Sequence, residues 1–175
     1  MDRMLTKHDV DKIVGQPVKI VLASDLHNKS SIADVLGDNN KALILYDYDR
    51  DGNTVIGHWC ALLLNRDGLS FYDPYGKFID DSLSFVPDEY KKYYGRKKNE
   101  LTRLMYHSPF KKLHYNPHCH QNVPNSSTCG RHCALFLKNE LEPEKYNDRI
   151  QKASKELGKK TDEVAYVVTK GMLGY

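Results

Sequence analysis

Cys129 stands in the surroundings that a nucleophilic thiol needs. It opens a predicted helix, directly after the small polar residues at 126–128, whose hydroxyls should cap that helix. The first backbone N–H groups of a helix have no partner within the helix and stabilise a thiolate beside them. Gly130 adds no side chain that would obstruct a peptide, so we expect it in the substrate-binding surface. Cys129 is therefore the candidate nucleophile.

His58 is the candidate base among the eight histidines. It lies in the apolar segment 54–65, where packing would fix the orientation of its ring. Its neighbours Gly57 and Trp59 are expected to contact the substrate. Asp73 ends the next predicted strand and is placed to accept a hydrogen bond from the far nitrogen of the imidazole. These residues predict a Cys-His-Asp arrangement for acyl transfer.

Acyl transfer also needs hydrogen-bond donors for the oxyanion of the tetrahedral intermediate. Gln121 lies in the irregular loop before Cys129, and its amide could act together with the backbone N–H of Cys129. Attack by a thiolate on a carbonyl requires no metal. We therefore expect no cofactor requirement.

A sheet flanked by helices is expected to position these residues. Strand patterns at 41–48, 54–65 and 69–73 are joined by Asp-Gly turns, which predicts an antiparallel meander with an apolar central strand. A short extended segment is predicted at 112–116, after a polar, basic segment at 80–105 that is either a solvated face or a nucleic-acid patch. Helical patterns occur at 6–15, 31–36, 129–141, 143–157 and 160–171.

The composition predicts one folded α+β domain over residues 1–175, since 40% of the residues are hydrophobic and 28% are charged. The net charge of +3 permits an anionic partner but does not require one. We find neither a membrane-spanning apolar stretch nor a signal peptide, so we expect neither secretion nor a membrane partner. The four cysteines should then be thiols, with Cys60 and Cys133 in the core and Cys119 without an assigned role.

Four sequence blocks, in the order His, acidic residue, Gln, Cys, resemble the adenovirus-type proteinases and the related SUMO-deconjugating enzymes. They are GHW at 57–59, LSFYDPYG at 69–76, Gln121, and STCGRHCALFL at 127–137. The resemblance covers about residues 41–140. It implies a papain-like cysteine protease fold with a central, mainly antiparallel sheet flanked by helices. It also implies that His58, Asp73, Gln121 and Cys129 are the catalytic residues.

The turn that follows Asp73, Pro-Tyr-Gly, is similar to that of the viral members of this family. The resemblance therefore implies a capsid maturation protease of a DNA virus or virophage, which would cleave capsid or virion precursor proteins after small residues such as Gly. Such an enzyme would act as a monomer in the virion and in the cytoplasmic viral factory or the nucleus of the host cell. The resemblance also raises activation by DNA or by a short peptide.

Other functions stay open from the sequence. The same triad could remove ubiquitin-like modifiers or transfer acetyl groups. A zinc-binding module is a different class, suggested by a crowd of potential ligands at His114, His118, Cys119, His120, Cys129, His132 and Cys133. The segment DYDRDG at 47–52 matches half of a calcium loop, but we expect a hairpin turn there, because position 58 holds His where the loop requires Glu.

Overall fold

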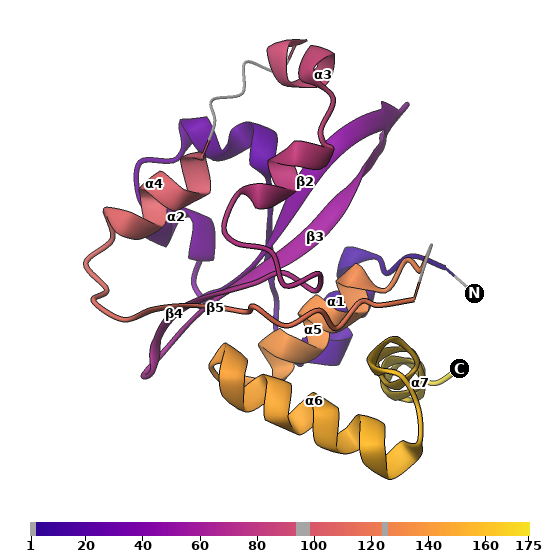
Figure 1. The fold of residues 1–175 in the computed structure, drawn as a ribbon. Coiled ribbons are helices and arrows are strands. Elements are labelled where there is room, and N and C mark those ends of the chain that lie inside the picture. Colours follow the sequence, from indigo (N-terminus) through magenta and orange to yellow (C-terminus); the bar gives the residue numbers. More distant parts are fainter. Residues whose placement is uncertain (1–2, 94–98, 124–125) are drawn as a thin grey trace.

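A mixed sheet separates two layers of helices (Figure 1). The computed structural model describes residues 3–93, 99–123 and 126–175. Within these residues five strands lie in the order in which they follow along the chain. They are β1 Lys19–Leu22, β2 Lys41–Asp51, β3 Thr54–Asn65, β4 Gly68–Tyr72 and β5 Leu113–Tyr115.

The central strands β2, β3 and β4 form the predicted antiparallel meander. β1 and β5 pair in parallel with β2 and β4, so the expectation of a mainly antiparallel sheet holds only for the centre. The reason lies in the connections: helices and turns separate each edge strand from its partner along the chain, whereas tight turns join the central strands. The segment 47–52 forms the end of β2 and the β2–β3 hairpin turn, as expected.

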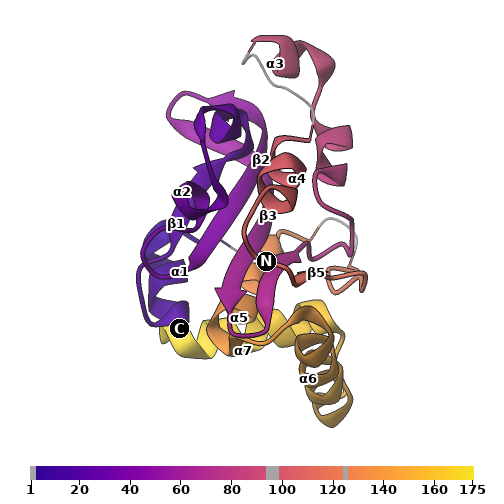
Figure 2. The ribbon, with the colours of Figure 1, turned by 90° about the vertical axis from the view of Figure 1, so that its left-hand side faces the viewer.

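The alternation of side chains along β3 supplies both helical layers with apolar contacts. Ala61 and Leu63 face one core, while Cys60 and Leu62 face the other. The first core is covered by helices near the two chain ends, namely α1 Lys7–Val14, α5 Cys129–Asn139, α6 Pro143–Leu157 and α7 Thr161–Leu173. The second core is covered by the short elements η1 Ala23–Asn28, α2 Ile32–Leu36 and α4 Glu100–Tyr106. Figure 1 shows α2 and α4 on one side of the strands and α5, α6 and α7 on the other, and Figure 2 gives the view from the side of α2 and α4.

The segment 80–105 is only partly the solvated face that its composition predicts. It contains η2 Asp81–Phe85, and α3 Asp88–Tyr93, which buries no residue. In contrast, α4 buries Leu101, Leu104 and Met105 in the second core, because these residues share one face of the helix. Residues 94–98, which carry much of the predicted basic patch, lie outside the described residues.

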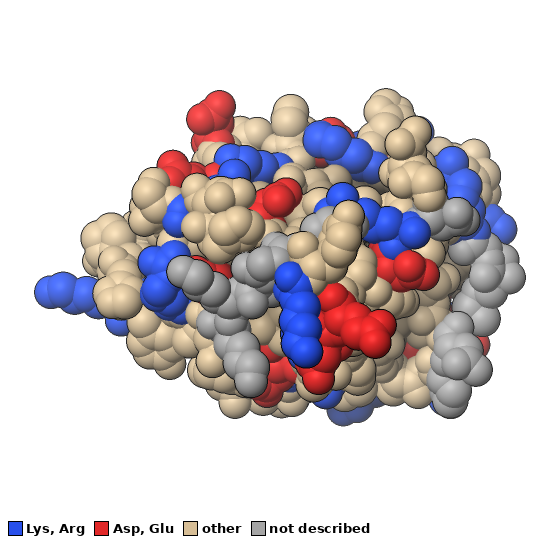
Figure 3. Space-filling model, turned by 90° about the horizontal axis from the view of Figure 1, so that it is seen from above, with Lys and Arg blue, Asp and Glu red and all other residues tan. Residues whose placement is uncertain are grey.

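Charges of both signs are mixed on the face that carries α3. Figure 3 shows Lys and Arg side chains interspersed with Asp and Glu side chains among the described residues of this face. An interspersed surface attracts polyanions less than a continuous basic patch does. No helix in the described part of the chain has both the length and the apolar character needed to cross a membrane.

Candidate active site

The end of β4 creates the space in which His58 lies. β4 ends at Tyr72, which pairs with Ala61, so the preceding half of β3 has β2 as its partner but not β4. The chain then continues to Asp73, whose carboxylate lies beside the His58 ring. The His58 Nε2 lies 2.9 Å from the Asp73 Oδ1. Both side chains are buried, so the predicted contact between base and acidic residue is formed inside the protein.

Besides His58, two residues donate hydrogen bonds to the Asp73 carboxylate. The Tyr75 backbone N–H donates to Oδ1 over 2.8 Å, and the Ser82 hydroxyl donates to Oδ2 over 2.8 Å. The Cys60 sulfur lies within 4.8 Å of the same carboxylate. A buried carboxylate with several donors keeps one orientation. Ser82 could not be predicted from the sequence, because it lies in η2, where no pattern marks it.

Tyr75 covers the imidazole of His58. The two rings stack with their centroids 4.7 Å apart and an angle of 27° between their planes. Because Tyr75 also donates its backbone N–H to Asp73, one residue restricts both partners. Sequence reasoning placed Tyr75 within the DPYG turn but gave it no role.

Cys129 is the first residue of α5, as predicted. Thr128 precedes it in a helical conformation, with φ −94° and ψ −1°, and no side chain caps the helix. The expectation that the hydroxyls at 126–128 cap α5 was therefore wrong, since an effective cap requires an extended residue at that position. The result is that no capping side chain competes for the first N–H groups of α5 beside the thiol.

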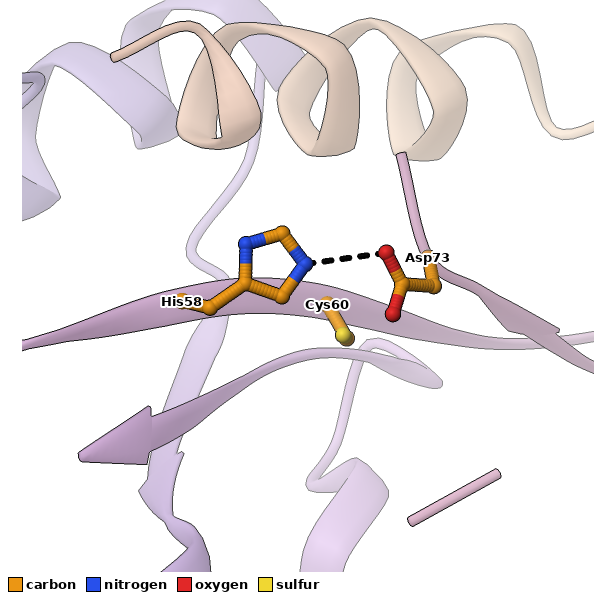
Figure 4. Close-up of side chains that lie close together, drawn as sticks. All are labelled: His58, Cys60 and Asp73. Atoms are coloured by element: carbon orange, nitrogen blue, oxygen red, sulfur yellow. Dashed lines mark hydrogen bonds and ion pairs between the residues drawn. The ribbon is translucent and has the colours of Figure 1, made fainter. Parts of the chain in front are cut away.

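Cys129 and Asp73 both raise the pKa of the same imidazole. Burial lowers the pKa of His58, but hydrogen bonds and charge interactions with Asp73 and Cys129 outweigh it and raise the pKa to about 9. Since Nε2 faces Asp73, Nδ1 is the nitrogen left for the thiol. Figure 4 shows the second ring nitrogen turned away from Asp73. This geometry suits an imidazolium that pairs with a thiolate.

Gln121 lies beside the same site and is fixed from two directions. Its backbone N–H donates to the Pro74 carbonyl over 2.9 Å, which ties the loop to the turn after Asp73. Its side-chain Nε2 donates to the Ser126 carbonyl over 2.8 Å. A primary amide has two N–H bonds, so one remains for an oxyanion. The structure thus brings together all four residues predicted for catalysis, whose roles stay predictions.

A groove of about 740 Å³ passes over these residues. It is lined by His58, Gln121 and Cys129 and by all three residues predicted to bind substrate, Gly57, Trp59 and Gly130. Most of its other walls are apolar or aromatic; they come from Met4, Leu5, Tyr48, Ile56, Tyr75 and Phe85. Such a surface suits an extended peptide with apolar side chains. The contribution of Met4 and Leu5 could not be predicted from their sequence.

A side chain would clash with the backbone at Gly57 but not at Gly130. A Cβ at Gly57 would lie 2.5 Å from the Tyr46 carbonyl oxygen, so the close approach of β2 requires glycine there. A Cβ at Gly130 would meet Trp59 at 3.7 Å and Leu5 at 3.9 Å, which are ordinary contacts. Gly57 is therefore needed for the sheet, whereas Gly130 leaves open space in the groove.

Cys60 belongs to the same cluster but suits a structural role. Its sulfur, a His58 nitrogen and an Asp73 oxygen lie within 4.8 Å of one another, a spacing that could also hold a metal ion (Figure 4). Burial, with the Asp73 charge as a further cause, raises the pKa of the Cys60 thiol well above its ordinary value. A cysteine that binds a metal must be a thiolate, whereas burial keeps this thiol protonated.

The residues that suggested a zinc module do not converge on one point. No three of them form a metal-ligand cluster in the part of the chain that the structure describes. Their side chains have other partners: His114 contacts the Asp67 carbonyl, His118 contacts Glu144 and Cys133 contacts the Trp59 carbonyl. These residues come from β5, the loop after it and α5, and the hydrogen bonds above go to separate partners.

Comparison with known proteins gives one informative relative. No protein-family model matches the chain. The chain is 31% identical to the uncharacterized protein V9 of the Sputnik virophage over 135 residues, which span 76% of this chain and 74% of the relative. The level of identity and the extent of coverage show that the chain belongs to the same family as the Sputnik virophage protein V9.

Proposed function

We propose that this protein is a cysteine endopeptidase with a papain-like catalytic arrangement. The observation that carries the proposal is the buried His58, hydrogen-bonded to Asp73 through Nε2, in the wall of the same groove as Cys129. The resemblance of the four sequence blocks to adenovirus-type proteinases supports the same assignment. Peptide hydrolysis uses each of these groups in one reaction.

The acylation step begins with attack of the Cys129 thiolate on the scissile carbonyl carbon. The carbonyl π electrons move to oxygen, and the oxyanion accepts hydrogen bonds from the Gln121 amide and the Cys129 backbone N–H. The tetrahedral intermediate collapses as the C–N bond breaks, and His58 gives its proton to the leaving amine. The product is a thioester on Cys129 and a free amine.

The deacylation step restores the enzyme with water. His58, now neutral, removes a proton from a water molecule that attacks the thioester carbonyl. The C–S bond breaks, the acid is released, and the thiolate and imidazolium are formed again. Throughout, Asp73 keeps Nε2 protonated and the ring oriented, as the acidic residue does in other triads.

We infer that the substrates are virion or capsid precursor proteins, cleaved after small residues such as Gly. Membership in a family with a virophage protein and the resemblance to viral maturation proteases support this substrate class. The enzyme would then act as a monomer in the virion and in the viral factory or nucleus of the host cell, and DNA or a short peptide would activate it. An alternative is removal of ubiquitin-like modifiers, which the same triad could perform.

Peptide cleavage can be tested before any substrate is identified. The wild-type protein is incubated with a peptide library and with the structural proteins of the encoding virus, and new termini are identified by mass spectrometry. Cys129→Ala should abolish cleavage while circular dichroism and thermal unfolding stay unchanged. A ubiquitin-like fusion cleaved after Gly-Gly, with virion proteins left intact, would support the alternative. Equal cleavage by Cys129→Ala would refute both.

A further inference from the structure

Asp162 binds both ends of the loop that separates Gln121 from Cys129. Its Oδ2 accepts the backbone N–H groups of Asn122, over 2.8 Å, and Val123, over 2.6 Å, which directly follow Gln121. Its Oδ1 accepts the hydroxyl of Thr128, which directly precedes Cys129. One buried carboxylate on α7 thus joins the residues next to the glutamine to the residue next to the nucleophile.

The same carboxylate also holds the helix that carries the nucleophile. His132, one turn after Thr128 in α5, places its Nε2 3.1 Å from the Asp162 Oδ1. Both side chains are almost fully buried, and the four donors replace the water that the carboxylate would otherwise bind. Burial raises the pKa of Asp162, but hydrogen bonds from His132, Thr128 and Val123 outweigh it and keep the pKa low. Asp162 is therefore ionised at neutral pH and is a strong acceptor.

Thr161, the residue before Asp162, also attaches this loop to α7. The hydroxyl of Thr161 donates to the His120 carbonyl, just before Gln121. The first turn of α7 therefore holds the chain on both sides of Gln121. The use of the Thr128 hydroxyl by Asp162 also explains why that hydroxyl does not cap α5.

We propose that Asp162 is a positioning residue for the oxyanion hole, setting the distance and orientation of the Gln121 amide relative to the Cys129 backbone N–H. This inference rests on the proposed protease function. Oxyanion donors must lie about 3 Å from the oxygen, so a shift of the loop weakens transition-state binding more than ground-state binding. The hydrogen bond between His58 and Asp73 does not involve this loop, since His58 lies in β3 and Asp73 directly follows β4.

Asp162→Asn is the test, because it keeps the shape but replaces one acceptor oxygen with a donor. The matched control is Glu163→Gln, which removes a carboxylate from the same turn of α7 but not from the loop; Glu163 bonds the Lys160 N–H instead. For the peptide that the wild-type protein cleaves, Asp162→Asn should lower kcat about 10- to 100-fold with KM changed less than about threefold. Affinity for the corresponding peptide aldehyde, which forms a tetrahedral adduct, should fall in parallel.

A second readout separates positioning from general damage. Alkylation of Cys129 by iodoacetamide needs the thiolate but no oxyanion hole, so Asp162→Asn should change its rate less than about twofold. Where Asp162→Asn does not fold, Thr128→Val and Thr128→Ser replace it: Val should show the loss of kcat and Ser should restore it. Unchanged kcat and aldehyde affinity, or an equal loss of alkylation, would overturn the inference. A wild-type protein that cleaves no peptide would instead contradict the proposed function.

Discussion

Asp73→Asn should weaken the reactivity of Cys129 through His58, without direct contact with the sulfur. In the intact site the pKa of His58 is about 9, compared with 6.5 for an ordinary histidine. This difference corresponds to about 3 kcal/mol in favour of the imidazolium. Burial opposes the charged ring, so loss of the Asp73 charge lets burial lower the pKa.

The size of the loss in Cys129 reactivity depends on the hydrogen bonds that the Asp73→Asn variant keeps. The Asn side-chain oxygen could still accept from Nε2, and the Tyr75 N–H and Ser82 hydroxyl could still orient it. We therefore expect a loss of about 10- to 100-fold in the rate of Cys129 alkylation near pH 7.5, within the upper limit of about 3 kcal/mol, and a measurable residual activity.

The assay is the second-order rate of iodoacetamide labelling of Cys129, measured by peptide mass mapping from pH 5 to 10. In the wild-type protein the labelling rate, divided by the fraction of Cys129 that is thiolate, should change near pH 9, because the imidazolium loses its proton there. In Asp73→Asn the same change should occur at lower pH. Asp80→Asn is the matched control, because Asp80 is also buried but bonds Tyr46 and Thr102. The same pH profile in wild type and Asp73→Asn would refute the orienting and charge-stabilising role of Asp73.

Further predictions concern stability. Gly57→Ala should destabilise the fold by about 2–3 kcal/mol, because the new Cβ clashes with the Tyr46 carbonyl. Gly130→Ala should change the free energy of unfolding by less than about 1 kcal/mol. Equal urea midpoints for the two variants would contradict this difference. Burial, with the nearby His132 and His118 as smaller causes, lowers the pKa of His120 to about 4. The unfolded state therefore binds more protons than the folded state between pH 6.5 and 4. The free energy of unfolding should fall by about 3 kcal/mol as the pH is lowered through this range. His120→Gln should reduce that slope in urea titrations at several pH values, and an unchanged slope would assign it to other groups.

The candidate triad was predictable because its members occupy positions with strong local patterns. His58 lies in an apolar strand, Asp73 ends the next strand, and Cys129 follows a loop and opens a helix. The Asp-Gly turns correctly indicated an antiparallel meander, which brings His58 and Asp73 together. Local pattern and chain topology were enough for these residues.

Residues that contact the site through hydrogen bonds from distant parts of the chain show no recognisable pattern in the sequence. Ser82 and Asp162 each contact the site from a different element, and neither has a periodicity that indicates its partner. β1 was missed because Lys19–Leu22 is too short for a recognisable alternation. The burial of α4 was missed because its three apolar residues follow a strongly charged segment, so composition masked the helical spacing.

The central claim is that Cys129 and His58 form a thiolate–imidazolium pair, and selective alkylation tests it most directly. Wild-type protein and His58→Ala are treated with limiting iodoacetamide at near-neutral pH, and each cysteine is quantified by peptide mass mapping. The account predicts fast modification of Cys129 ahead of the exposed Cys119, with at least a roughly tenfold slower reaction of Cys129 in His58→Ala. Labelling of Cys129 that is no faster than that of Cys119, and unchanged without His58, would contradict it.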